Sequence, residues 1–191
     1  MHNDTYMPTL ESERLVLRRI TKDDVDDMFA YACDPNVSRF TTWDSHRTLE
    51  DTLKYINVVL TKYENNEPTD WGIVDKQYGK FIGTVGFVYV NSNHSRAEIG
   101  YALSKKYWEQ GIMTEAVREI IRYGFQELAL NRIEARAEVP NIGSWRVMEK
   151  VNMKFEGILR QHLFAKGAFH DLKLYSILAD DYKALFAPSS T

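Results

Sequence analysis

The feature that most constrains the fold is a strand-like run followed by a turn and a long amphipathic helix, between Arg96 and Ala129. The run RAEIGYAL has its apolar residues at alternate positions, which is typical of a strand with one buried face. Apolar residues then recur at helical spacing from Ala116 onward, while charged residues fill the other side. The first amides of such a helix lack partners within the helix and lie at the positive end of its dipole, so the preceding turn suits an anion such as a pyrophosphate.

The rest of the chain predicts a mixed α/β (α+β) fold with a mostly antiparallel central sheet. We expect about six or seven strands and about four helices. Asp34-Pro35-Asn36 is expected to end the first helix, and Ala165-Lys166-Gly167 to form the turn of a closing hairpin. Besides the strand and helix described above, we predict helices over 21–32, 48–63 and 144–151, and strands over 15–17, 71–74, 81–90, 132–139, 157–164 and 172–178.

Length and charge limit the class of protein. With 191 residues, 44% of them hydrophobic, the chain can bury one substantial core, and we expect a single domain over 1–191 with a core of about 10–180. The net charge of -3 gives no electrostatic footprint for nucleic acid. No basic start precedes an apolar stretch, and no run of about 18 apolar residues occurs, so we expect no membrane insertion and a cytoplasmic location.

Several kinds of site lose support on sequence grounds. Cys33 is the only cysteine and lies in an apolar pattern, so we expect a buried, inert thiol and no disulfide. The five histidines lack paired ligand spacing, so we expect no metal site. Neither a Gly-rich string ending in Gly-Lys-Ser/Thr nor a GxGxxG motif occurs, which disfavours ATP hydrolysis and nicotinamide chemistry. The acidic run at 23–27 could attract a cationic amine, but a solvated helix face is the favoured interpretation.

The turn before the long helix contains one glycine, Gly111. Its amide and those of Gln110, Ile112 and Met113 could cradle a pyrophosphate. Taken by itself, a lone glycine before a helix is more typical of an ordinary strand-to-helix loop. The turn therefore needs support from other motifs.

Four ordered motifs supply that support. They are AEIGYALSKKYWEQGIMTEA, FQELALNRIEARAEVPNIGS, EKVNMKFEG and the spacing KGAFHDLKLYSI. Together they resemble the RimJ/RimL branch of the GNAT acetyltransferases, in register over roughly 10–178. The resemblance implies the GNAT acyl-CoA N-acyltransferase fold, acetyl-CoA as the cofactor, and transfer of its acetyl group to an amine.

The resemblance also implies a cofactor site. The family's phosphate motif falls on the stretch from Trp108 to Met113; Trp108 stands where the family has a polar residue and Met113 where it has a small one. Because backbone amides do the binding, we expect the site to survive both changes. The residues expected at the cofactor are Tyr101, Ala102, Leu103, Trp108, Glu109, Gln110, Gly111, Ile112, Met113, Thr114, Asn141 and Ser144.

The attacking amine must lose a proton, since a lysine-type amine has a pKa of about 10.4 and an α-amine of about 8. Glu98 matches the position where several relatives in the superfamily keep their base. Alternatively, Glu98 has a structural role and pairs with Arg96 or Arg136. His162 is a second candidate base. The alternative is that it is an ordinary surface or half-buried residue of a strand.

The leaving thiolate, with a pKa of about 8.5, needs only modest acid help. Many relatives use a tyrosine whose position here is Met148, and Ser144 is the matching hydroxyl in this branch. Ser144 could equally serve the backbone at a helix start, and Asn141 could cap that helix or contact the cofactor. No residue pattern favours a covalent intermediate, so we expect direct attack.

By resemblance, Phe40 and Trp43 form the wall of the acceptor site. The acceptor is a primary amine: a protein N-terminus, such as that of a ribosomal protein, or a polyamine or aminoglycoside-type amine. A module that binds acetyl-CoA with little or no catalysis is the alternative. A homodimer is a family expectation only.

Overall fold

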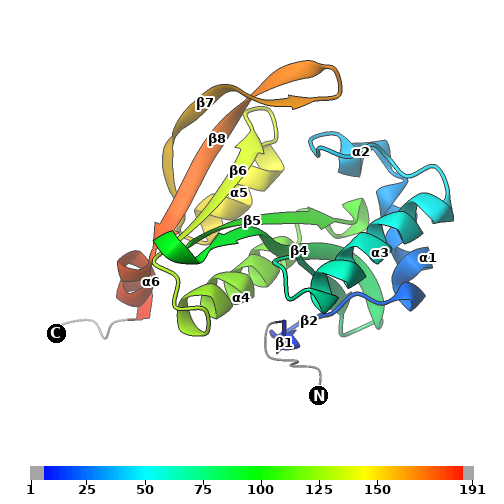
Figure 1. The fold of residues 1–191 in the computed structure, drawn as a ribbon, viewed down its shortest axis with the longest axis horizontal. Coiled ribbons are helices and arrows are strands. Elements are labelled where there is room, and N and C mark those ends of the chain that lie inside the picture. The colour runs from blue at the N-terminus through cyan, green and yellow to red at the C-terminus, as the bar shows by residue number, and fades with distance from the viewer. Residues whose placement is uncertain (1–6, 187–191) are drawn as a thin grey trace.

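A computed structural model describes residues 7–186 of the chain, which form one eight-stranded sheet with helices on both faces (Figure 1). The strand order is β1-β2-β3-β4-β5-β6-β8-β7. The strands are β1 Leu10–Glu11, β2 Leu15–Arg18, β3 Asp70–Asp75, β4 Lys80–Asn91, β5 Arg96–Leu103, β6 Arg132–Glu138, β7 Lys154–Ala165 and β8 Ala168–Leu178. The helices are α1 Val25–Ala32, α2 Pro35–Ser38, α3 Leu49–Glu64, α4 Ile112–Gln126, α5 Ile142–Lys150 and α6 Ala179–Phe186.

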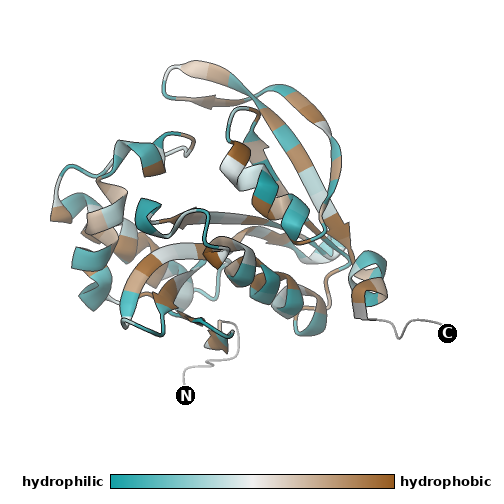
Figure 2. Cartoon of the chain, turned by 180° about the vertical axis from the view of Figure 1, so that it is seen from behind, coloured by the Kyte–Doolittle hydropathy of each residue, from teal (hydrophilic) through white to brown (hydrophobic). Residues whose placement is uncertain are grey.

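Strand alternation divides the sheet into two faces. Trp71 of β3 packs edge-on against Phe87 of β4 and Tyr123 of α4, with ring centroids 6.1 and 5.4 Å apart. We call this side, which α4 and α5 cover, the α4 face, and the opposite side, which α1 and α3 cover, the α3 face. Seen from behind in Figure 2, α4 carries both hydrophilic and hydrophobic residues, as its amphipathic sequence predicts.

The predicted α/β architecture and the mostly antiparallel sheet are confirmed. The helix predicted to open at Thr48 does so, because the Thr48 hydroxyl accepts the Asp51 N–H while the Asp51 carboxylate accepts the Thr48 N–H. The predicted number of elements was too small: the described residues form eight strands and six α-helices. The missed elements are the short strand β1, the helix α2 and the C-terminal α6.

The segment from Asp34 to Asn36 both ends one helix and starts another. α1 stops at Ala32, as expected. The Asp34 carboxylate then accepts the Asn36 N–H at 2.8 Å, and Pro35 occupies the first position of α2. A stop signal in the sequence is therefore also a start signal in the structure.

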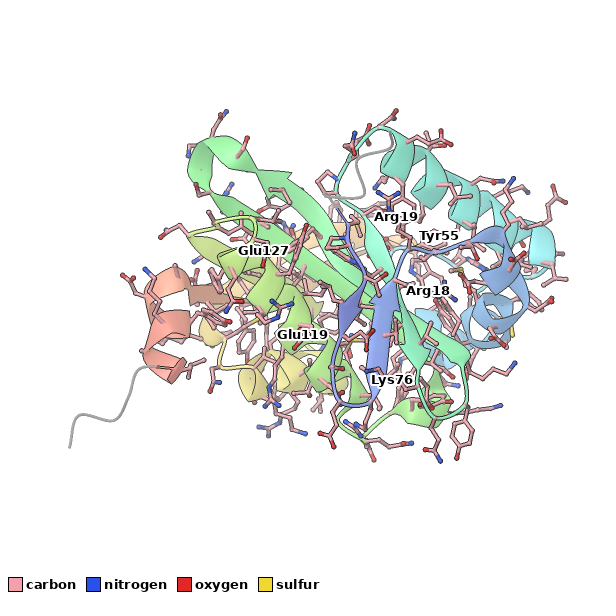
Figure 3. The ribbon with its side chains drawn as sticks, turned by 90° about the horizontal axis from the view of Figure 1, so that it is seen from below. Arg18, Arg19, Tyr55, Lys76, Glu119 and Glu127 are labelled. Carbon is pink, nitrogen blue, oxygen red and sulfur yellow. The ribbon has the colours of Figure 1, made fainter. Side chains whose placement is uncertain are left out.

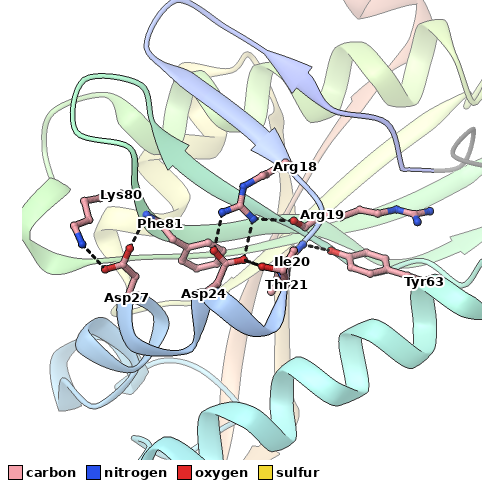
Figure 4. Close-up of polar contacts among 9 residues, drawn as sticks. All are labelled: Arg18, Arg19, Ile20, Thr21, Asp24, Asp27, Tyr63, Lys80 and Phe81. Atoms are coloured by element: carbon pink, nitrogen blue, oxygen red, sulfur yellow. Dashed lines mark hydrogen bonds and ion pairs between the residues drawn. The ribbon is translucent and has the colours of Figure 1, made fainter.

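The acidic run is not only a solvated face, and this corrects the prediction. Asp24 is 6% exposed and pairs with Arg18 at 2.6 and 2.8 Å, while Asp27 pairs with Lys80 at 3.1 Å (Figure 4). Burial opposes the Asp24 charge, but hydrogen bonds from Arg18 and Thr21 outweigh it and lower the pKa of Asp24. The run thus fastens α1 to β2 and to the start of β4.

A further ion pair lies at the edge of the sheet. Lys76 Nζ, labelled in Figure 3, binds Glu11 Oε2 at 2.9 Å and so ties the loop after β3 to β1.

Cys33 is exposed rather than buried, because Tyr31 and Ala32 supply the buried face of α1 and Cys33 lies just past the end of the helix. The expectation of a buried thiol was wrong.

One pair of neighbouring strands is parallel, and it is short. β5 pairs with β6 over four residues, from Arg96↔Arg132 to Ile99↔Ala135. Beyond Ile99, β5 continues along β4 to Leu103, while β6 continues along β8 to Glu138. The two strands therefore part, and the parallel connection between them carries α4.

Candidate active site

The gap between β5 and β6 opens beside the first turn of α4. Gly100, Tyr101, Ala102 and Leu103 keep β4 as a partner but have none on the β6 side among the described residues. Backbone groups on that edge lack a strand partner and can bind a ligand, except the Leu103 carbonyl, which accepts a hydrogen bond from Trp108 Nε1. Strand separation and a helix start are thus brought together by the connection from β5 to β6.

The turn that precedes α4 has the conformation of an anion cradle. Gly111 has a φ of 77° and Glu109 a φ of 62°, both left-handed. The Glu115 N–H is the first to bind back, to the Gly111 carbonyl at 3.0 Å, so the amides from Ile112 to Thr114 precede the helical ladder. The Met113 side chain is 6% exposed and packs in the core, so this departure from the family pattern leaves the amides open.

Cationic side chains surround this turn. A hollow of about 550 Å³ is lined by Glu13, Arg14, Gly111, Thr114, Glu115, Arg118 and Lys150. Arg14 is fixed there by Glu115 at 2.7 Å and by the Gln110 carbonyl at 3.1 Å, and Arg118 donates to the Lys150 carbonyl at 3.2 Å. Sequence reasoning missed the three cations, because they come from separate parts of the chain.

Trp108 and Gln110 brace the turn with their side chains. Trp108 Nε1 donates to the Leu103 carbonyl at 2.8 Å, and Gln110 Nε2 donates to the Lys106 carbonyl at 2.7 Å. Both side chains therefore bind the backbone that leads into the turn. Trp108 keeps the turn against the end of β5, which accounts for an indole at a position where the family has a polar residue.

On the α4 face, Tyr101 and Ser144 form a pair of hydroxyl groups. The Tyr101 hydroxyl donates to the Ser144 carbonyl at 2.9 Å, and Ser144 Oγ donates to the Tyr101 oxygen at 3.1 Å. Burial raises the pKa of Tyr101, so its hydroxyl stays protonated at neutral pH. Asn141 Oδ1 accepts the Ser144 N–H at 3.3 Å and caps α5. Met148 is 1% exposed in the core, so the phenols that contact α5 are Tyr101 and Tyr175, whose hydroxyl donates to Glu149 Oε1 at 3.2 Å.

On the α3 face, Glu98 and His162 are joined through Arg136. Arg136 Nε binds Glu98 Oε1 at 2.9 Å and its Nη2 binds the other carboxylate oxygen, while Nη1 donates to His162 Nε2 at 2.5 Å. Glu98 is 7% exposed, and of its two proposed partners Arg136 forms the pair. Because an arginine stays protonated, both predicted bases face a permanent cation.

His162 reaches Arg136 because β7 bulges. The register with β8 shifts between Leu159 and Leu163, and Gln161 adopts a φ of 50°. The Asp171 carboxylate accepts the Gln161 N–H at 2.7 Å and fixes this bulge. The bulge directs the exposed imidazole toward the α3 face.

Phe40 and Trp43 lie between α2 and α3, and both are half-buried. Arg39 stacks over the Phe40 ring at 4.9 Å, and Trp43 lies 5.5 Å from His46. The tip of the β7–β8 hairpin reaches this part of the molecule, since Lys166 Nζ donates to the Ser38 carbonyl of α2 (Figure 1). The structure thus places both residues near the hairpin tip. Neither of them forms a hydrogen bond with Glu98 or Ser144.

Two classes of feature are absent from the part of the chain that the structure describes. No helix in residues 7–186 has the length and apolar character required to cross a membrane. The same residues contain no group of three or more His, Cys, Asp or Glu side chains arranged to hold a metal ion.

Comparison with known proteins identifies the family. The model of the acetyltransferase (GNAT) domain matches residues 14–154. The uncharacterized N-acetyltransferase p20 of Bacillus licheniformis is 35% identical over 179 residues, covering 92% of this chain and 99% of that protein. A GNAT-family acetyltransferase structure from Bacillus anthracis has a TM-score of 0.80 at 27% identity, over 90% of this chain and 99% of the other. RimL, a ribosomal alpha-N-protein acetyltransferase in complex with coenzyme A, has a TM-score of 0.81 at 19% identity, over 91% and 99%. The chain belongs to the GNAT acetyltransferase family.

Proposed function

We propose that the protein is an acetyl-CoA-dependent N-acetyltransferase of the RimJ/RimL-like branch that moves the acetyl group directly onto a primary amine. The observation that carries the proposal is the gap between β5 and β6 next to the start of α4. A strand edge can hold the extended arm of the cofactor, and the helix start can hold its pyrophosphate. Both ends of one ligand are then met by one continuous stretch, from Gly100 to Thr114.

The residues present fit acetyl-CoA. The amides from Ile112 to Thr114 would bind the pyrophosphate, and Arg14, Arg118 and Lys150 add positive charge around it. The cofactor supplies an activated acetyl thioester. Trp108 acts on the shape of the turn through its bond to the Leu103 carbonyl.

The two faces of β5 then divide the chemistry. The amine approaches from the α3 face, which Phe40 and Trp43 flank, and the sulfur leaves toward the α4 face. There the Ser144 and Tyr101 hydroxyls can pass a proton to the thiolate. No covalent enzyme intermediate is required, in keeping with an exposed Cys33 at the end of α1.

For the acceptor we propose the α-amine of a protein N-terminus. Support comes from the similarity to RimL, which acts on a ribosomal protein. A polyamine or aminoglycoside-type amine is the second candidate, and a cofactor-binding module without catalysis is the third. The homodimer, the single domain and the cytoplasmic location remain predictions.

The test is a panel of amines with acetyl-CoA, followed by release of free thiol. The panel contains peptides with free and blocked N-termini, spermidine, lysine and an aminoglycoside. We expect turnover with the free peptides and none with the blocked ones. Thermal stabilisation by coenzyme A, with ATP and NAD as controls, measures binding separately. Stabilisation without thiol release for any amine would favour the non-catalytic module.

A further inference from the structure

A second carboxyl group lies on the α3 face, at the first residue of β3. Asp70 Oδ2 accepts the Tyr55 hydroxyl of α3 at 2.5 Å, while Oδ1 has no hydrogen-bond donor among residues 7–186. Asp70 is partly exposed, yet burial raises its pKa. This combination is expected of a group that is surrounded by protein and still open on one side. Asp70 is therefore held in one orientation and keeps a free lone pair.

Asp70 lies in the same row of the sheet as the point where β5 and β6 part. Asp70 pairs with Gly86, and Gly86 pairs with Gly100, the first residue of β5 beyond the last partner on β6. A Cβ on Gly86 would lie 2.2 Å from the Thr69 carbonyl oxygen, 2.5 Å from Asp70 Cα and 2.8 Å from Asp70 Oδ1, so Gly86 lies directly against Asp70 and adds no side chain over Oδ1. Because the next two positions in the row are glycines, no side chain of the row separates Oδ1 from the gap.

The distances suit a small nucleophile. Neighbouring strands lie about 4.8 Å apart and β5 is the second strand from β3, about 9.6 Å away, so a nitrogen next to the gap connects to Oδ1 through a bridging water. The Val88 side chain lies beside Gly100 on this face, since a Cβ on Gly100 would lie 3.0 Å from Val88 Cγ2. Between Asp70 and the gap, the paired residues Gly86 and Gly100 therefore contribute no side chains to this face.

The two bases predicted from the sequence are less free than Asp70. Both oxygens of Glu98 and Nε2 of His162 are bound by Arg136. Two charge-assisted hydrogen bonds hold the Glu98 carboxylate against Arg136 and leave neither oxygen without a donor. The charged and titratable groups that interact with Asp70 are one lysine and three tyrosines: Lys62, Tyr55 and Tyr63 of α3, and Tyr31 of α1.

We propose that Asp70 accepts the proton of the acceptor amine and that Tyr55 is its positioning residue; this rests on the proposed function. The ammonium group gives one proton, through the bridging water, to Asp70 Oδ1, which passes it to solvent. The nitrogen lone pair forms the bond to the acetyl carbon, and the C–S bond breaks with its electron pair moving to sulfur. The nitrogen loses a second proton to become the amide, and the thiolate gains one, so one proton is released overall.

The test compares Asp70→Asn with Glu98→Gln in kcat/KM as a function of pH. We expect Asp70→Asn to lower kcat/KM by about 10²-fold or more and to remove its acid limb. Glu98→Gln should keep that limb. Stabilisation by coenzyme A should be the same in both variants and in the parent protein. An unchanged profile in Asp70→Asn, or loss of the limb in Glu98→Gln alone, would overturn the assignment to Asp70.

Tyr55→Phe gives a second readout that does not depend on loss of activity. Because the Tyr55 hydrogen bond lowers the pKa of Asp70, its removal should move the acid limb to higher pH. Tyr78→Phe, at an exposed tyrosine between β3 and β4, is the matched control and should leave the profile in place. A limb that stays fixed in Tyr55→Phe contradicts the proposal. Absence of thiol release by the parent protein with every amine would instead overturn the proposed function, and this inference with it.

Discussion

Polar groups on the α3 face of β5 are held by charge, whereas those on the α4 face are held by neutral hydrogen bonds. Glu98 binds the guanidinium of Arg136, but Tyr101 and Ser144 bind each other. Because neighbouring residues of a strand point to opposite faces, side chains only three positions apart in sequence have entirely different electrostatic surroundings. The difference suggests that proton removal belongs to one face and proton supply to the other.

The largest effect is expected when the positive charge of Arg136 is removed from the α3 face. Arg136→Met leaves the Glu98 carboxylate, 7% exposed, without its cation. We expect the free energy of unfolding to fall by about 2 kcal/mol, below the value for a fully buried pair because the Arg136 side chain is 27% exposed. Urea denaturation measures the change. Combining Arg136→Met with Glu98→Gln should recover part of the loss, and a purely additive double variant would show that the pair is not coupled.

The α4 face can be tested through backbone conformation instead of charge. Gly111→Ala places a side chain at a φ of 77°, which favours other conformations of the turn in the free protein. We expect acetyl-CoA affinity to fall about fivefold, the equivalent of about 1 kcal/mol, with kcat within twofold. Titration calorimetry measures it. Gly143→Ala in α5, where an added Cβ meets nothing within 4 Å, should bind normally, and equal losses in both variants would contradict the prediction.

The carboxyl groups of Asp24 and Asp70 have pKa values that are shifted in opposite directions. The pKa of Asp24 is lowered, so its ion pair stabilises the fold above the ordinary aspartate pKa and this stabilisation is lost as the pH falls through the lowered value. The pKa of Asp70 is raised, so its ionised form weakens the fold as the pH rises from the ordinary value through the raised one.

Thermal unfolding of the two asparagine variants at pH 7 and at acid pH checks these signs. Asp24→Asn should lose about 1 kcal/mol at pH 7 and progressively less toward pH 2. Asp70→Asn should be at least as stable as the parent protein at pH 7, because it removes a buried charge. A large loss in Asp70→Asn at pH 7 would mean that its carboxylate serves the fold.

The smallest effect is expected for the hydroxyl pair. Ser144→Ala should lower kcat about threefold, because a thiolate is already a tolerable leaving group. Tyr101→Phe should have a similar effect, and the double variant should be no worse than either, since the two hydroxyls act together. Steady-state rates with one saturating amine test this. A decrease of a hundredfold or more would show that the α4 face carries a larger part of the chemistry.

Local signals in the sequence predicted much of the fold. The capping residues of α3 and the alternation along β5 depend on near neighbours, so both were found. β1 was missed because a two-residue strand is defined by its pairing with β2, and α2 was missed because its cap, Asp34, was interpreted only as the end of α1.

The site was harder to predict for the same reason. The pairing of Glu98 with Arg136 depends on the register of two parallel strands that are separated by a helix. Asp70 reads as the end of a polar loop, and only the packing of α3 reveals its tyrosine partner. The Trp108 to Met113 turn could be located from its motif, but its cations could not, since they come from the loop before β2, from α4 and from α5.

The connection from β5 through α4 to β6 also bears on how such a protein can change over time. One crossover both separates the strands and positions the helix start, and the groups proposed to bind the pyrophosphate there are amides, which every residue type except proline possesses. Side chains along the turn are then free to drift, as Trp108 and Met113 have done. Related proteins can therefore keep the same fold while most of their residues differ, which agrees with the TM-score of 0.81 at 19% identity to RimL.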